Sequence, residues 1–208
     1  MTHSDDKGLV LPPRLAPTEA VIVPIFKNET KEAVLAFARK LRDTLSHEFR
    51  VTLDEDDQNT PGWKFSEYEL QGIPVRIEIG PRDMEKGQIV AVRRDTGAKV
   101  FVPVAEAGPR LRAMLDDMQR ALYERALKFR TENTFRATNW AELAARIEEP
   151  GGFVEAGWCG DAACEAKVKE ETKATIRLLP LEKKSMDGVA CAVCGKQASD
   201  IAVFARAY

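Results

Sequence analysis

Four cysteines form two close pairs near the end of the chain, and their spacing indicates the clearest chemistry in the sequence. Four residues separate Cys159 from Cys164, and two separate Cys191 from Cys194, which Gly195 follows. Two thiolates in such a knuckle can bind one tetrahedral metal ion, and the glycine lets the turn close. Four thiolates leave no open coordination position. The sequence therefore predicts a structural zinc ion held by these four cysteines.

Three other states of these cysteines stay open: two disulfides, a thioredoxin-like redox pair, or four unlinked thiols. Residues 1–8 are polar and acidic, so we expect no secretory signal, and this argues against disulfides. Redox pairs usually open a helix within a strand–helix–strand unit, whereas Lys196 and Gln197 follow the second pair here. Zinc remains the preferred interpretation.

A second set of side chains could read an unstacked guanine. Phe65 and Glu69 are four residues apart, which places them on one face of an expected short helix. Arg76 alternates with apolar residues of the next expected strand, and Arg82 and Asp83 follow in an expected turn. Carboxylates accept hydrogen bonds from guanine N1 and N2, arginine donates to O6 and N7, and an aromatic ring stacks. On residue chemistry alone, an ordinary amphipathic surface explains these charges better.

The rest of the sequence provides no convincing active site. We expect His3 to lie near a frayed end, and His47 to be a solvated residue at a helix end. The acidic run 54–57 lacks the spacing of a calcium loop, and no Walker or dinucleotide-binding motif is present. The net charge of −2 excludes a global basic field, and no apolar stretch is long enough to span a membrane.

Alternating patterns indicate that these residues lie on an α/β framework. Apolar runs and period-2 alternation predict five strands, and period-3.6 stripes predict helices between and after them. The strands are expected at 20–26, 49–53, 75–79, 89–92 and 99–104, and the helices at 30–45, 63–71 and about 111–129. We predict a mixed five-stranded sheet flanked by helices, with the strand at 75–79 half exposed.

A smaller α+β domain is expected after this sheet. The polar segment 131–138 interrupts the pattern, and we place the domain boundary there. A helix capped at Asn139, a second helix at 161–171, and short strands near 153–158, 175–179 and 201–205 follow. The four cysteines lie within this second domain.

Five short strings in the sequence are distinctive: PGWKF at 61–65, GPRD at 80–83, CGDAAC at 159–164, CAVCG at 191–195 and FARAY at 204–208. They resemble prolyl-tRNA synthetase, a class IIa aminoacyl-tRNA synthetase, in its archaeal and eukaryotic architecture with an extra C-terminal zinc domain. This resemblance extends over essentially all 208 residues. It implies a C-terminal fragment: residues 1–17 as the end of the catalytic core and linker, 18–130 as the anticodon-binding domain, and 131–208 as the zinc-binding domain.

The resemblance also implies an activity and partners. The full-length enzyme would ligate proline to its tRNA with ATP and magnesium, as a cytoplasmic homodimer without membrane contact. This chain lacks the catalytic motifs, so we expect it to be inactive alone and to bind the proline tRNA anticodon stem-loop and its own catalytic core. The alternative is a free-standing RNA-binding accessory module, and a zinc-dependent interaction domain without RNA binding is a weaker third hypothesis.

Motif matching assigns roles to the residues that the chemistry had already selected. Glu69, Arg76, Arg82 and Asp83 would read the anticodon guanines, with Phe65 as a stacking partner. The carboxylate of Tyr208 would reach toward the active site of the full-length enzyme. The sequence departs from the family pattern at three positions: Arg82 replaces a common lysine, Asp56 a frequent arginine and Ser4 a glycine. Asp56 would weaken RNA backbone contacts.

Overall fold

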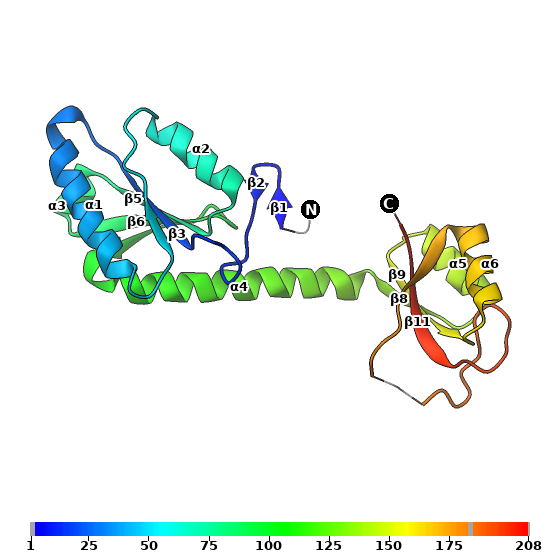
Figure 1. Ribbon diagram of the computed structural model, residues 1–208. Helices are drawn as coiled ribbons and strands as arrows, with labels where there is room; N and C mark the ends of the chain where they lie inside the picture. Colours follow the sequence, from blue (N-terminus) through cyan, green and yellow to red (C-terminus); the bar gives the residue numbers. More distant parts are fainter. Residues whose placement is uncertain (1–2, 183–184, 208) are drawn as a thin grey trace. The chain divides into compact units, whose positions relative to one another are not determined.

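The chain divides into two compact units. The structure is a computed structural model that describes residues 3–182 and 185–207 (Figure 1). Unit 1 is Met1–Glu124 and unit 2 is Arg125–Tyr208. Their division lies inside the long helix α4 (Ala107–Glu132), a few residues before the polar segment where the sequence suggested a boundary. Each unit has its own sheet and its own core.

Unit 1 contains the expected mixed five-stranded sheet, in the order β4-β3-β5-β6-β7. Strands β3, β4 and β5 are parallel, β6 pairs antiparallel with β5, and β7 pairs antiparallel with β6. The strands are β3 (Ala20–Pro24), β4 (Val51–Leu53), β5 (Val75–Ile79), β6 (Gln88–Arg93) and β7 (Lys99–Pro103). The parallel strands are joined by α1 (Lys31–Leu45) and α2 (Pro61–Gln71), with the short η1 (Asn28–Thr30) before α1.

The two faces of this sheet are covered by different helices. Val75, Ile77 and Ile79 of β5 pack in one core with the apolar stripes of α1 and α4. Because side chains alternate along a strand, Arg76 and Glu78 point to the opposite face, where α2 lies. All five residues of β5 are therefore buried, and the prediction of a half-exposed strand was wrong.

Local sequence explains why α2 begins and ends where it does. Thr60 accepts a hydrogen bond from the Trp63 backbone amide, and Pro61 occupies the first helical position. Gly72 ends the helix in the left-handed conformation, at φ +74°. The hairpin of β1 (Ser4–Asp5) and β2 (Gly8–Leu9) packs beside this end.

Two further segments, one in unit 1 and one near the end of α4, differ from expectation. The turn expected after Gly80 is the short helix α3 (Pro81–Glu85). The stripe of α4 is buried at Leu111, Leu115, Met118 and Leu122, but Phe129 is 67% exposed. The connection from β7 to α4 includes η2 (Val104–Glu106).

Unit 2 is a four-stranded sheet with helices, as the predicted α+β domain requires. Its strand order is β10-β11-β9-β8. The elements are β8 (Thr134–Ala137), α5 (Trp140–Glu148), β9 (Phe153–Trp158), α6 (Ala162–Thr172), β10 (Ala174–Leu178) and β11 (Asp200–Arg206). Strand β8 was not expected, because its sequence lies within the polar segment that we took for a boundary. Among the described residues, no helix is long and apolar enough to cross a membrane.

Candidate nucleic-acid and metal sites

Arg76 is the centre of a side-chain cluster on the face of the unit 1 sheet that α2 covers. Its guanidinium donates from Nε and Nη2 to Glu78 Oε1, at 3.1 and 2.9 Å. The Phe65 ring lies against the same guanidinium, 4.0 Å from ring centroid to Cζ. Glu69 Oε1 lies 3.5 Å from Nη1. The structure thus brings together three of the five predicted guanine-reading residues: Phe65, Glu69 and Arg76.

Glu78 and Lys99 also belong to this cluster, and the sequence reasoning missed both. Arg76 and Glu78 are each 8% exposed, and the partnership keeps either charge from being buried alone. Lys99 Nζ lies 3.5 Å from Glu78 Oε2 and gives this carboxylate a second cation. The signal for Glu78 was present, because residues two apart on a strand share a face.

The cluster presents a balanced set of hydrogen-bonding groups to solvent. Two cations and two carboxylates compensate each other, so it does not attract phosphate by net charge. The Glu69 side chain is 32% exposed and carries acceptor oxygens, whereas Arg76 is held in place beneath it. Phe101 of β7, 64% exposed, lies on the same face in the row of Glu78 and Val90. Such a surface suits recognition of a base edge more than of a backbone.

Arg82 and Asp83 lie on α3, and they are not joined to this cluster by any contact recorded among the described residues. Arg82 is exposed, and in the described part of the chain it has no hydrogen bond or ion pair. Asp83 Oδ2 accepts the Gly80 backbone amide at 3.0 Å and so caps α3, while Oδ1 accepts from Gln88 at 3.3 Å. Asp83 therefore has a structural role that the sequence did not indicate.

The acidic run after β4 contributes to a buried network. Lys64 of α2 is 3% exposed and pairs with Asp54 Oδ1 at 2.8 Å, and it also donates to the Asp56 carbonyl. The Tyr68 hydroxyl donates to Asp54 Oδ2 at 2.8 Å. The pKa of Tyr68 is raised, mainly by burial and to a lesser extent by this hydrogen bond to the carboxylate. The exposed Asp56 carboxylate has a lowered pKa because the Gln58 amide and the Asn59 side chain donate to it. The acidic segment therefore binds α2 through Asp54 and the Asp56 carbonyl, while the Asp56 carboxylate faces solvent.

The four cysteines of unit 2 converge on one point. Their sulfur atoms all lie within 4.8 Å of one another, with Cys159 Sγ 3.6 Å from Cys164 Sγ and 3.7 Å from Cys194 Sγ. A zinc–sulfur bond of about 2.3 Å gives tetrahedral edges of about 3.8 Å, whereas a disulfide needs about 2.05 Å. The cysteines are free, and they are positioned to bind a metal ion such as zinc.

The knuckle backbone prepares these thiols for a metal. Burial raises the pKa of Cys191, but amides of Cys194 and Val193 donate to its sulfur and bring that pKa to about 7. Gly157 allows the close approach of the knuckle to β9, since a Cβ there would lie 2.3 Å from the Ala190 carbonyl oxygen. Cys164 enters from the first turn of α6, whose N-cap Asp161 accepts the Ala163 amide. Elements from three parts of unit 2 therefore hold the site.

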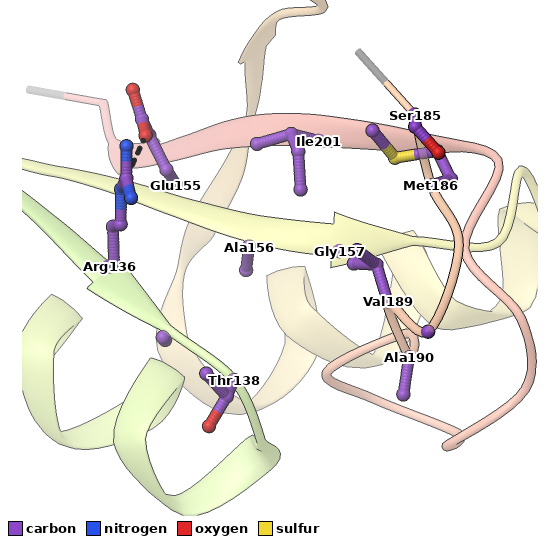
Figure 2. Close-up of a pocket in the computed structure, with 12 residues that line it drawn as sticks. Arg136, Thr138, Glu155, Ala156, Gly157, Ser185, Met186, Val189, Ala190 and Ile201 are labelled. Carbon is purple, nitrogen blue, oxygen red and sulfur yellow. Dashed lines mark hydrogen bonds and ion pairs between the residues drawn. The ribbon is translucent and has the colours of Figure 1, made fainter.

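Unit 2 also contains a hollow of about 530 Å³ beside β8 and β9 (Figure 2). Arg136 and Glu155 form an ion pair of 3.3 Å in the lining of this hollow. Figure 2 shows Ser185 and Met186 in a different part of the lining, away from this ion pair. Small and apolar residues, including Ala156, make up most of the remaining lining. The two hydroxyls of the lining, those of Thr138 and Ser185, donate to the carboxylates of Glu142 and Asp187 at 2.9 and 2.7 Å.

Comparisons with known proteins match both parts of the chain. Residues 19–114 match the family model of the anticodon binding domain, and residues 140–208 match that of the prolyl-tRNA synthetase C-terminal domain. A proline–tRNA ligase of Oceanobacillus iheyensis is 52% identical over 208 residues, which are 100% of this chain and 42% of that protein. Proline–tRNA ligase 2 of Bacillus cereus is 46% identical and a proline–tRNA ligase of Clostridium botulinum 47% identical, each over the whole chain and 43% of the relative.

These matches define the chain as the anticodon-binding part of an aminoacyl-tRNA synthetase. More particularly, it corresponds to the C-terminal region of prolyl-tRNA synthetase, with its anticodon-binding domain followed by the C-terminal domain of that family. The chain spans less than half the length of these relatives. The expected archaeal and eukaryotic type is corrected, since the relatives named here are bacterial proteins.

Proposed function

We propose that this chain selects the tRNA for a prolyl-tRNA synthetase by reading the guanines of the proline anticodon. The observation that carries the proposal is the cluster of Phe65, Glu69 and Arg76 on a domain that matches anticodon-binding domains. The whole enzyme would use ATP and magnesium to ligate proline to its tRNA. The catalytic core, a homodimer and a cytoplasmic location belong to this proposal.

The geometry supports a division of labour among the reading residues. Glu69, the more exposed carboxylate of the cluster, would accept from guanine N1 and N2. Glu78 orients Arg76 by accepting from Nε and Nη2. Arg76 would therefore donate to the base from Nη1, whose contact with Glu69 is the longest of the three, at 3.5 Å. One face of the Phe65 ring is covered by Arg76, so a base would stack on the other face. Arg82, an exposed cation on α3, would also contact the anticodon guanines. Asp83 would contact them from the position in which it caps α3.

The second unit would serve as a zinc-stabilised brace. Cys159, Cys164, Cys191 and Cys194 supply four sulfur ligands in the arrangement of a closed structural site. Zinc there would contribute folding free energy and no chemistry. Tyr208, whose carboxylate we expect to approach the active site of the full-length enzyme, lies outside the described residues.

Variants of the reading residues test this function through binding of a synthetic anticodon stem-loop. Replacing guanine with inosine removes the N2 donors, so Glu69→Gln should lose most of the preference for guanine over inosine. Arg76→Lys keeps a cation beside Glu78 but removes the fork, and it should weaken guanine binding by about tenfold, equivalent to about 1.4 kcal/mol. Fluorescence anisotropy measures both affinities.

The control is Lys40→Ala, an exposed substitution on α1. It should change affinity for both loops equally and leave the guanine preference intact. If Glu69 were only a solvated charge, Glu69→Gln would relieve repulsion from phosphate and strengthen binding of both loops. That result would remove Glu69 from the site.

A further inference from the structure

Arg94, which follows β6, connects three segments that are distant in the sequence. Its side chain is 4% exposed. Nε donates to the backbone carbonyl of Glu69 at 2.9 Å, and Nη1 and Nη2 donate to Asp5 Oδ2 and Oδ1 at 2.8 and 2.6 Å. Its own backbone amide donates to the Pro74 carbonyl at 2.9 Å. The guanidinium therefore joins the N-terminal hairpin to the end of α2.

The carbonyl that Arg94 contacts belongs to a residue of the proposed reading site. The last carbonyls of a helix lack partners within the helix, and a cation there also complements the helix dipole. The Glu69 carbonyl accepts from the Gly72 amide at 3.1 Å and from Arg94, and these two bonds fix the backbone that carries the Glu69 side chain. Glu69, Arg76 and Arg94 also line one small cavity of about 10 Å³.

The N-terminal hairpin meets this end of α2 through direct backbone contact. A Cβ at Gly8 would lie 2.5 Å from the Cα of Leu70, and one at Gly72 would lie 2.5 Å from the Cβ of Leu9. The Leu11 amide also donates to the Gly72 carbonyl at 3.3 Å. The hairpin and the helix end are thus packed as one piece, and Asp5 holds Arg94 from the hairpin side.

We propose that Arg94 is a positioning residue for guanine reading, and that Asp5 and the β1–β2 hairpin support it. This inference rests on the proposed function of Glu69. Arg94 does not need to touch RNA, because it sets where the Glu69 carboxylate stands relative to Arg76. The competing explanation is that Arg94 only attaches the hairpin, in which case its loss would change stability and leave base preference unchanged.

The experiment compares Arg94→Lys with Arg93→Lys in the full chain. Arg93 is a matched control, since it is the adjacent arginine and also pairs with two carboxylates, Asp95 and Asp117, on the opposite face of the sheet. Lysine keeps the charge but lacks the planar fork by which Arg94 bonds Asp5 through both terminal nitrogens and the Glu69 carbonyl through Nε. We expect Arg94→Lys to lower the guanine-over-inosine affinity ratio by roughly tenfold, the effect of one charge-assisted hydrogen bond. Arg93→Lys should lower the melting temperature without changing that ratio.

Asp5→Asn is the second variant, at an exposed position, and asparagine keeps one acceptor oxygen for Arg94. It should lower the same ratio by a smaller factor, because the bond from Nε to Glu69 remains. An unchanged ratio in Arg94→Lys and Asp5→Asn, while Glu69→Gln loses its ratio and Arg76→Lys loses affinity for guanine, overturns this inference and leaves the proposed function standing. An unchanged ratio in Glu69→Gln, together with an unchanged guanine affinity in Arg76→Lys, overturns both.

Discussion

Arg76 and Lys64, two of the buried cations in unit 1, are each held by groups that fix their direction. Arg76 is aimed by Glu78, and Lys64 is bound by Asp54 and the Asp56 carbonyl. A buried ammonium or guanidinium is tolerated only where hydrogen bonds replace its hydration. The identities of the chemical groups were readable from the sequence, but their burial was not. Period-2 alternation at Arg76 marks a polar face, and only the packing of α2 decides that this face is covered.

The Lys64 network gives a test of stability at this scale. Lys64→Met leaves Asp54, whose side chain is 8% exposed, with no cation beside it and only neutral donors, the Tyr68 hydroxyl and the Asp56 backbone amide. We expect a loss of about 3–5 kcal/mol in the free energy of unfolding, as for other broken buried pairs. Urea denaturation measures it, with the exposed Lys40→Met as the control. A loss below about 1 kcal/mol, the range of surface pairs, would show that the ion pair is not a buried one.

At the scale of elements, the sequence correctly predicted those strands and helix ends that depend on local residue patterns. The strands at Ala20–Pro24 and Lys99–Pro103 and the helix N-cap at Asn139 agree with expectation. Strand β8 was missed because its polar residues acquire strand structure by pairing with β9, a contact that no local signal encodes. Helix α3 was predicted as a turn because Gly80-Pro81 can begin a turn or a helix. The Asp83 side chain caps the first turn and thereby favours the helix. The cysteine site was readable because ligand spacing is itself local.

The knuckle predicts a metal stoichiometry. We expect one zinc ion per chain in protein purified without chelator, measured by elemental analysis. Cys194→Ser should reduce this to well below one ion per chain, since hydroxyl oxygen is a poor replacement for thiolate at a four-sulfur site. Ser199→Ala, an exposed neighbour of the knuckle, should retain full zinc. Two disulfides per chain with no metal would contradict the assignment.

At the scale of the whole molecule, the two units depend on different sources of stability. The unit 1 core combines large aliphatic residues from the sheet with the stripes of α1 and α4. In the unit 2 core, half of the ten buried residues are alanines, among them Ala156 and Ala202, so it buries less apolar volume per residue. Small domains with thin cores usually need a metal or a disulfide.

This difference predicts that removing zinc unfolds one unit and spares the other. Metal binding contributes folding free energy, so a chelator at neutral pH should abolish amide protection in α6 and β11 while α1 and β5 stay protected. The first turns of α4 should also stay protected, because Leu111 and Leu115 pack in the unit 1 core. Hydrogen exchange by mass spectrometry measures this for each segment, and restoring zinc should restore unit 2. The stem-loop affinity and guanine preference should survive chelation, since Phe65, Glu69 and Arg76 all belong to unit 1. Loss of protection in β5, or of guanine preference, would show that unit 1 also depends on the metal.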